Sequence, residues 1–267
     1  MIKLVVAGAA GRMGKTILTL AGLDSAFRIV AGLEQEGNRL IGTEIGPWIG
    51  ASHVSARIIG DPDEALASSD VLIDFTHPSA LPMHLEAAIA AGAGYVLGTT
   101  GLTSKDLRLV QTAAKKIPVV QSPNMSVGVN LLFKLAELTS RALDERYDIE
   151  ITETHHRMKK DAPSGTAMKL LEIIAQARKR NPGKDTVYGR KGETGVRPAG
   201  KIGVLALRGG DVVGDHTVFF LGDGERIELT HKASSRDAFA LGALKAAKFV
   251  VRRKRGLYNM SQVLGIA

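Results

Sequence analysis

The sequence predicts an α/β protein: a Rossmann-type, doubly wound parallel sheet domain with an inserted mixed-sheet α+β domain. Two observations carry this prediction. Up to about Asn124, short apolar runs alternate with stretches suited to helices, a pattern typical of a parallel sheet covered on both faces. After Gly200, three strand-like runs follow one another without helices between them, which indicates a mixed or antiparallel sheet.

The first part of the chain predicts five strands and three helices. Ile2 opens the first apolar run, which ends in a glycine-rich turn, and Glu34 closes the second run. We predict strands at residues 2–7, 28–33, 71–75, 95–98 and 118–121, and helices at 12–22, 79–91 and 103–115. Ser104 is a possible cap of the third helix. Residues 34–60 are rich in glycine and predict no definite element.

The second part predicts long helices around a group of strands. We expect helices at 126–143, 164–180 and 235–252, and strands at 147–155, 201–208, 214–221 and 225–232, with a loop from about 181 to 200. The last helix can pack back on the first domain. The predicted domains are therefore residues 1–126 with 235–267, and residues 127–234.

The formal net charge of +8 comes from two short clusters. Six basic residues and one acidic residue lie between Arg178 and Lys191, and residues 252–255 are all basic. We interpret both clusters as solvated helix ends and loops. A nucleic-acid surface needs basic and aromatic contacts spread along the chain, and aromatic residues are only 4% here, so we expect no nucleic-acid partner.

The absence of cysteine narrows the possible chemistry. It excludes disulfides, thiol nucleophiles, cysteine zinc sites and iron–sulfur clusters, and it fits a reducing compartment. No apolar stretch approaches the roughly 20 residues that span a bilayer, and the N-terminal run reads as a strand rather than a signal peptide. We therefore expect a cytoplasmic protein without a membrane partner.

A glycine-rich turn between the first strand and the first helix predicts a dinucleotide site. The segment Gly8-Ala-Ala-Gly11-Arg-Met-Gly14 allows a tight turn, close approach of the backbone to a pyrophosphate, and an anion at the helix N-terminus. Ala9 stands where the common G-x-G-x-x-G spacing has its first glycine. Glu34 at the end of the second strand can accept hydrogen bonds from ribose hydroxyls.

The preference between NADH and NADPH stays open. Glu34 would repel a 2′-phosphate, whereas Arg12 could attract one. Two loops that follow later strands can line the nicotinamide end, because ligands gather at the carboxyl ends of such strands. These loops contain Gly98, Thr99 and Thr100, and Ser122, Pro123, Asn124 and Met125.

Residues 153–167 hold the densest chemistry of the chain. His155 and His156 are adjacent on a strand, so their side chains point to opposite faces, and we expect no shared metal ion. This geometry suits one acid/base group and one substrate ligand, with the ammonium of Lys159 nearby. Ser164, with Gly165 and Thr166 behind it, can open a helix whose N-terminus binds an anion. An ordinary helix start beside a basic loop is the alternative interpretation.

Together these segments resemble the dihydrodipicolinate reductase (4-hydroxy-tetrahydrodipicolinate reductase) family of bacteria and plants. Residues 153–167 match the signature E-x-H-H-x-x-K-x-D-A-P-S-G-T-A throughout. The turn at residues 8–14, the loop at 98–101 and the segment at 228–236 are also similar to the family's, so the resemblance spans nearly the whole chain.

The resemblance implies roles for individual residues. His155 would donate or accept a proton and Lys159 would be a second proton donor, while His156, Ser164, Gly165 and Thr166 would bind the substrate. The dinucleotide would be held by Gly8, Ala9, Ala10, Gly11, Arg12, Met13, Glu34, Gly98, Thr99, Thr100, Ser122, Pro123, Asn124 and Met125. Gln35 stands where some members have an arginine, which leaves Arg12 as the expected contact for a phosphate.

The implied activity is an NAD(P)H-dependent reduction in lysine and diaminopimelate biosynthesis. 4-Hydroxy-tetrahydrodipicolinate would be reduced to tetrahydrodipicolinate with loss of water, using NADH and/or NADPH and no metal. The resemblance also implies that the second domain binds this dicarboxylate and forms a homotetramer. The alternatives are another Rossmann-fold dehydrogenase of a small acidic substrate, and a non-catalytic dinucleotide sensor.

Overall fold

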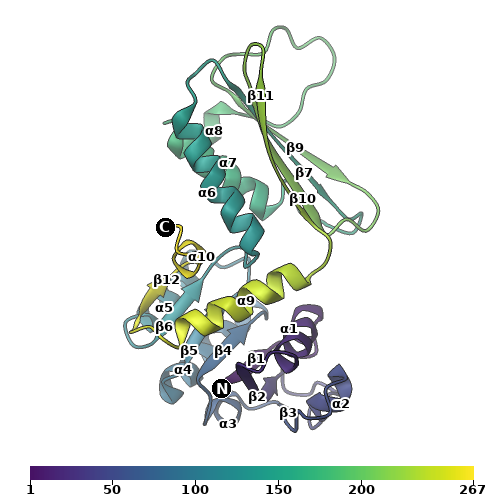
Figure 1. Cartoon of the computed structure of the whole chain (residues 1–267), viewed down its shortest axis with the longest axis vertical. Coiled ribbons are helices and arrows are strands. Elements are labelled where there is room, and N and C mark those ends of the chain that lie inside the picture. Colours follow the sequence, from purple (N-terminus) through teal and green to yellow (C-terminus); the bar gives the residue numbers. More distant parts are fainter. The chain divides into compact units, whose positions relative to one another are not determined.

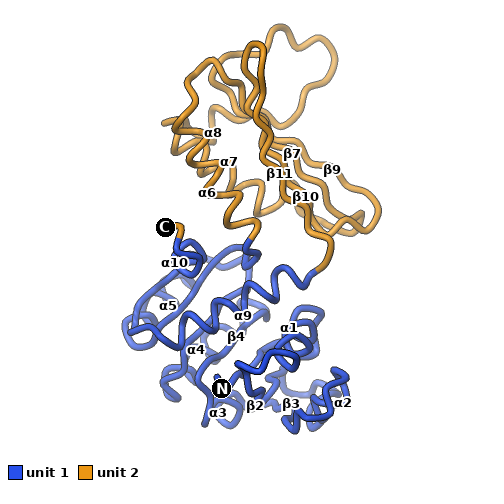
Figure 2. Tube along the Cα trace, in the orientation of Figure 1, with its two compact units in different colours: residues 1–127, 236–265, 267 blue, residues 128–235, 266 orange.

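The computed structural model describes residues 1–267 and shows helices packed against two separate β-sheets (Figure 1). The chain divides into two compact units, made of residues 1–127, 236–265 and 267, and of residues 128–235 and 266 (Figure 2). None of its helices combines the length and the apolar composition needed to cross a membrane. The fold class predicted from the sequence is confirmed.

The first unit is built on a parallel sheet of seven strands in the order β12-β6-β5-β4-β1-β2-β3. The strand order reverses between β1 and β4, which places the ligand-binding edge of such a sheet at their carboxyl ends. The strands are β1 (Ile2–Ala7), β2 (Phe27–Leu33), β3 (Arg57–Ile59), β4 (Val71–Asp74), β5 (Gly94–Leu97), β6 (Pro118–Gln121) and β12 (Gly256–Tyr258).

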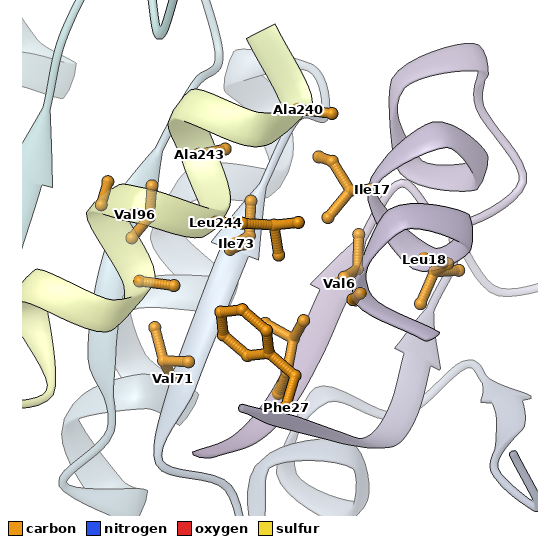
Figure 3. Close-up of a cluster of buried hydrophobic side chains, with 14 of the residues drawn as sticks. Val6, Ile17, Leu18, Phe27, Val71, Ile73, Val96, Ala240, Ala243 and Leu244 are labelled. Carbon is orange, nitrogen blue, oxygen red and sulfur yellow. The ribbon is translucent and has the colours of Figure 1, made fainter. Parts of the chain in front are cut away.

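Helices cover both faces of this sheet. They are α1 (Arg12–Gly22), α2 (Ile45–Ile49), α3 (Pro62–Leu66), a 3-10 turn η1 (Pro78–Ala80), α4 (Leu81–Ala91), α5 (Ser104–Ala113), α9 (Asp237–Val250) and α10 (Met260–Leu264). Helices α1 and α9 pack on one face, where Ile17 and Leu244 meet Val6 and Ile73 of the sheet (Figure 3). The strands alternate, so their other residues meet α3, α4 and α5 on the opposite face.

The second unit has a mixed sheet of five strands in the order β11-β10-β7-β9-β8. β7 pairs in parallel with β9 and antiparallel with β10. The elements are α6 (Val127–Ala142, whose first residue belongs to the first unit), β7 (Asp148–His155), α7 (Gly165–Ala177), α8 (Pro182–Asp185), β8 (Thr186–Val187), β9 (Ile202–Arg208), β10 (Gly214–Leu221) and β11 (Arg226–Ala233).

One face of the mixed sheet is covered and the other is open. Ile149 and Ile151 of β7 and Phe220 of β10 pack against α6 and α7. Residues between them, such as Thr152 and Thr217, point to the opposite face and are half-buried. Buried and half-buried residues therefore alternate along β7 because helices cover only one face of this sheet.

Several elements differ in detail from the prediction. Thr103, not Ser104, caps α5, because its hydroxyl accepts from the amide of Asp106 in a capping box. Helix α7 ends at Ala177, and Lys179 then adopts a left-handed backbone with φ of 53°. The region between 34 and 60 contains α2 and β3, while the predicted loop after residue 181 contains α8 and β8.

The first basic cluster is less solvated than predicted. Arg178 donates to the carbonyl of Asp144 at 2.6 Å, and Arg180 forms an ion pair with Glu145. Asp144 and Glu145 lie in the turn before β7, and Glu150 on the open face of the sheet pairs with Arg190 in the same way. Arg178, Arg180 and Arg190 of this cluster therefore have acceptors inside the second unit, while Lys179, Lys184 and Lys191 are exposed as predicted.

Candidate active site

The turn between β1 and α1 has the geometry that a dinucleotide phosphate needs. Gly8 has φ of 74°, a left-handed conformation that favours glycine, and its carbonyl accepts from the amide of Gly11 at 2.9 Å. A Cβ on Gly14 would lie 2.0 Å from the Gly8 oxygen, so the helix can approach the turn only with glycine there. The N-cap Gly11 makes no side-chain capping bond, which leaves the N-terminus of α1 open to an anion.

Glu34 lies beside this turn. Its carboxylate accepts from the amide of Ala10 at 2.8 Å, which fixes the carboxylate next to the glycine loop. A cavity of about 1230 Å³ opens here, lined by residues that include Gly8, Gly11, Glu34, Thr76 and His84. The cavity is large enough for a ligand of dinucleotide class.

The remaining predicted turn residues differ in exposure. Ala9 is fully buried and packs toward Gly32, so it contributes backbone only. Arg12 is exposed at the first position of α1, and Met13 is half-buried against the core. An exposed guanidinium at this position can approach a ligand phosphate.

A buried carboxylate lies at the carboxyl end of β4. Asp74 is fully buried and bonds to His84 Nδ1 at 2.8 Å, to the Tyr95 hydroxyl at 2.5 Å and to the Thr76 hydroxyl at 2.6 Å. Burial raises the pKa of Asp74, but the hydrogen bonds and the positive character of His84 outweigh it and leave that pKa below its usual value. The network fixes Thr76 and His84 along the wall of the cavity.

The two further loops of the first unit follow β5 and β6. Gly98 packs on the ring of Phe75, since a Cβ there would lie 2.3 Å from the ring, and the buried Thr99 hydroxyl reaches Asp74 at 3.2 Å. Thr100 is exposed. In the second loop Ser122 and Met125 are buried, Pro123 is exposed, and the side chain of Asn124 accepts from the amide of Ser126 at 2.8 Å.

The second unit holds a buried acid–base cluster centred on Glu153. Oε2 of Glu153 lies 2.5 Å from His155 Nδ1, and both carboxylate oxygens accept from Arg208, at 2.8 Å each. β7 carries the acid and the histidine, and Arg208 ends the neighbouring β9 directly opposite His155. Burial raises the pKa of Glu153, but the bonds from Arg208, His155 and Ser164 lower it more, so the carboxylate is ionised at neutral pH.

His155 is buried and surrounded by basic groups. Its ring meets His216 edge to face, with centroids 5.2 Å apart. Burial lowers the pKa of His155, the Glu153 carboxylate opposes this, and the charges of Lys159 and Arg208 lower it further, with a net decrease from 6.5. A Cβ on Gly214 would lie 2.9 Å from His155 Nε2, so this glycine leaves the space beside that nitrogen.

Lys159 lies in the loop after β7, and His156 begins that loop. The Lys159 ammonium pairs with Asp161 at 2.9 Å and is one-fifth exposed. His156 is half-buried, and its backbone amide donates to Val212 at 2.7 Å. The second unit therefore holds the Lys159 ammonium close enough to His155 and His216 to act electrostatically on both imidazoles.

Ser164 starts α7, as its sequence position predicts. Its hydroxyl accepts from the amide of Ala167 at 3.2 Å and lies 3.1 Å from His216 Nε2, and its own amide donates to Glu153 at 3.0 Å. Ser164 is almost fully buried, whereas Gly165 is exposed. The exposed residue of this helix start is therefore Gly165, with the half-buried Thr166 next to it, rather than Ser164.

Three residues of these clusters escaped the sequence analysis. Asp74, Arg208 and His216 carry no motif of their own, and they meet most of their partners only through tertiary packing: Arg208 through the pairing of β7 with β9, Asp74 through His84 of α4 and Tyr95 of β5, and His216 through Ser164 at the start of α7. Asp74 ends an apolar strand with a charge, as Glu34 does, which is a signal that could have found it. His216 has its pKa lowered to about 3, chiefly by burial, so it is neutral at physiological pH.

The chain is similar to known proteins over nearly its whole length. Family models match residues 2–125 as the N-terminus and residues 128–264 as the C-terminus of dihydrodipicolinate reductase. The 4-hydroxy-tetrahydrodipicolinate reductase of Nitrosomonas europaea is 50% identical, covering 99% of this chain and 98% of that protein. The corresponding protein of Anaeromyxobacter dehalogenans is 47% identical, covering 100% and 98%.

Solved structures show the same likeness. Dipicolinate-bound dihydrodipicolinate reductase from Paenisporosarcina sp. TG-14 superposes with a TM-score of 0.76 at 25% identity, covering 97% of each chain. A probable dehydrogenase from Thermotoga maritima, with a TM-score of 0.63 at 12% identity over 99% of this chain and 93% of that one, shares the fold. The chain belongs to the dihydrodipicolinate reductase family.

Proposed function

We propose that this protein catalyses the NAD(P)H-dependent reduction of 4-hydroxy-tetrahydrodipicolinate to tetrahydrodipicolinate in lysine and diaminopimelate biosynthesis. In the overall reaction the substrate, NAD(P)H and a proton give the product, NAD(P)⁺ and water. The observation that carries the proposal is the cluster of Glu153, His155 and Lys159 at the start of α7. This cluster combines a proton carrier with cations, as the reduction of an acidic substrate requires.

The first unit supports the binding of the dinucleotide. The open N-terminus of α1 and the Gly8–Gly14 turn fit a pyrophosphate, and Glu34 lies where ribose hydroxyls would be bound. When bound, NAD(P)H supplies the hydride. Arg12 is our proposed contact for a 2′-phosphate, while Glu34 favours NADH, so we propose that both coenzymes are accepted. The two loops proposed to line the nicotinamide end contain Gly98, Thr99 and Thr100, and Ser122, Pro123, Asn124 and Met125.

The second unit supports binding of a dicarboxylate and transfer of a proton. The Lys159 ammonium would supply a positive charge to the carboxylates, and the His156 imidazole and the N-terminus of α7 at Gly165 and Thr166 would add further contacts. Hydride arrival leaves negative charge on the ring, which a proton from His155 or Lys159 neutralises. Ser164 contributes by starting the helix, since its side chain is buried.

We further propose a homotetramer that works in the cytoplasm. The open face of the second sheet carries Phe219 and Leu207, the latter 52% exposed, and has no helix over it. Apolar side chains on an uncovered sheet face are typical of an assembly surface. The first unit would thus serve as the dinucleotide domain and the second as the substrate and oligomerisation domain.

Binding of pyridine-2,6-dicarboxylate, a flat analogue of the substrate, tests the proposed site. Titration calorimetry in the presence of NADH should show saturable binding to the protein, and Lys159→Ala should weaken it at least tenfold by removing a charge-assisted contact. NADH binding measured by fluorescence should be the same in both proteins. An absence of dicarboxylate binding to protein that binds NADH would contradict the proposal.

A dinucleotide sensor and a dehydrogenase of another small acid are the alternatives to this proposal. A sensor would bind NADH and show no turnover with any acid. Another dehydrogenase would turn over a different small acid and ignore 4-hydroxy-tetrahydrodipicolinate. The buried His155–Glu153 pair and the Lys159–Asp161 pair in the following loop favour turnover over sensing, because a sensor needs no proton carrier.

A further inference from the structure

We propose that Glu153 is a positioning residue that sets the tautomer and direction of His155 and ties that imidazole to the start of α7. The inference rests on the proposed function, because it assigns how the proton carrier of that reaction is held. Glu153 does not face the reacting atoms: its side chain is fully buried. It acts through the groups that it binds.

All four acceptor positions of the Glu153 carboxylate are occupied. Oε2 binds His155 Nδ1 at 2.5 Å and Arg208 Nη1 at 2.8 Å. Oε1 binds the Ser164 amide at 3.0 Å and Arg208 Nη2 at 2.8 Å. A carboxylate has about four lone-pair sites, so Glu153 is saturated and has no site left for a substrate proton.

This saturation fixes the protonation of His155. An ionised carboxylate only accepts hydrogen bonds, so the neutral imidazole carries its proton on Nδ1. Nε2 is then the nitrogen that exchanges protons with a ligand. The space on that side exists because residue 214 is glycine: a Cβ on Gly214 would lie 2.9 Å from Nε2.

The same carboxylate joins two parts of the site. Ser164 is the N-cap of α7, and its amide is bound to Glu153, so the helix start and the imidazole share one anchor. Arg208 holds the anchor from β9 and also donates to the carbonyl of Asp161 at 2.7 Å, in the loop that carries Lys159. The buried ion pair of Glu153 and Arg208 therefore sets the relative positions of the His155 imidazole, the loop that carries Lys159, and the start of α7.

The charged and titratable groups around His155 come from every strand and loop packed against it. They are Glu153 on β7, Arg208 on β9, His216 on β10, His231 on β11 behind His216, and Lys159 and Asp161 in the following loop. Of those that act directly on His155, only Glu153 favours the imidazolium. Removing its charge leaves Arg208 and Lys159 unopposed and makes His155 harder to protonate.

The variant Glu153→Gln tests the inference, with Glu150→Gln as its matched control. Glu150 lies on the same strand, is largely buried and binds two arginines, Arg190 at 2.8 Å and Arg197 at 2.9 Å, on the opposite face. Both variants exchange a buried acid for its amide and break an ion pair with arginine. Only the first alters a contact of His155.

We expect Glu153→Gln to lower kcat by about 10²-fold. The Gln amide can donate to Nδ1 and so favours the wrong tautomer. The alkaline limb of the kcat/KM profile, which reports loss of the imidazolium, should move down by about 1 pH unit. The Kd for NADH should not change. Glu150→Gln should lower the unfolding temperature and leave the position of the limb unaltered.

Two results would overturn the inference. One is a Glu153→Gln enzyme whose limb stays at the wild-type pH and whose kcat matches that of Glu150→Gln. The other comes from the wild-type protein labelled with ¹⁵N-histidine, and it remains available if Glu153→Gln does not fold. Long-range ¹H–¹⁵N spectra, assigned with His155→Gln, should show Nδ1–H for His155; an Nε2–H tautomer contradicts the account. A wild-type enzyme without turnover would instead remove the proposed function, while the NMR result would stand.

Discussion

The protonation of His155 depends on a balance between burial, one carboxylate and two cations. Burial lowers its pKa, Glu153 raises it, and Lys159 and Arg208 lower it again. Its folded pKa lies below 6.5, so the imidazolium is present at low pH and is lost as the pH rises through that value. Activity that needs the imidazolium therefore declines on the alkaline side of this pKa.

Lys159→Met should show both roles of the ammonium. We expect kcat to fall by about 10²–10⁴-fold, because the proton donor that we propose is lost. The alkaline limb of the residual activity should move to higher pH, because a positive charge that lowers the pKa of His155 is gone. Steady-state kinetics over a pH series measures both effects.

Lys160→Met is the control for this prediction. Lys160 is the next residue and is exposed, and we assign it no role in the site. The variant therefore removes the same charge as Lys159→Met without removing the proposed proton donor. Equal losses of kcat in the two variants would show that overall charge, rather than the Lys159 ammonium, supports turnover.

Gly214 provides a second test at single-residue resolution. In Gly214→Ala the added Cβ would lie 2.9 Å from His155 Nε2, so the imidazole must move. Since Glu153 holds the other nitrogen, we expect kcat to fall by about 10–100-fold with the fold retained. Gly209→Ala, where a Cβ meets nothing within 4 Å, should retain wild-type kinetics. Wild-type kcat in Gly214→Ala would show that the site tolerates a displaced imidazole.

At the scale of elements, the contact between the glycine turn after β1 and helix α1 determines the shape of the proposed phosphate site. Gly14→Ala would place a Cβ 2.0 Å from the carbonyl oxygen of Gly8, which is backbone and cannot rotate away. We expect a loss of about 1–3 kcal/mol in the free energy of unfolding and at least a tenfold rise in the Kd for NADH. Urea unfolding and fluorescence titration measure these quantities.

Gly22→Ala in the same helix is the matched control. Its Cβ would meet side chains only, Ile49 at 3.2 Å and Ala51 at 3.3 Å, far from the glycine turn. We expect it to affect stability slightly and to leave NADH binding unchanged. An equal loss of NADH binding in both variants would mean that helix stability, rather than the shape of the turn, governs the site.

Strong periodic segments were predictable, and short elements were not. The strand at Ile2–Ala7 and the helix at Arg12–Gly22 agree with the sequence because an apolar run, a turn and an amphipathic stretch follow in order. β3 and β12 have three residues each, so no alternation can reveal them, and only pairing with β2 and β6 creates them.

The candidate site was predictable where its residues are adjacent in sequence. His155, Lys159 and Ser164 fall within one segment, and the structure brings them together in one unit. Arg208 lies 55 residues from its partner Glu153 and reaches it only because β7 and β9 pair in parallel register. Register depends on tertiary packing, which a single sequence does not specify.

At the scale of the whole molecule, the prediction to be tested is the assembly of four chains into a homotetramer. Four copies of the 28.3-kDa chain give about 113 kDa, which light scattering after size-exclusion chromatography measures directly. We expect that mass for the wild type. Leu207→Glu should lower the measured mass, because assembly through the open sheet face would bury the new carboxylate. A monomeric wild type would contradict the proposed tetramer and leave the reaction unaffected.

The central claim is the reduction itself, and a turnover assay tests it most directly. NADH and NADPH oxidation should be followed with freshly generated 4-hydroxy-tetrahydrodipicolinate, using the purified chain and a His155→Ala control. We predict coenzyme oxidation that depends on the substrate, yields tetrahydrodipicolinate, and falls by orders of magnitude in the control. Folded wild-type protein that binds NADH yet oxidises neither coenzyme with this substrate would contradict the account.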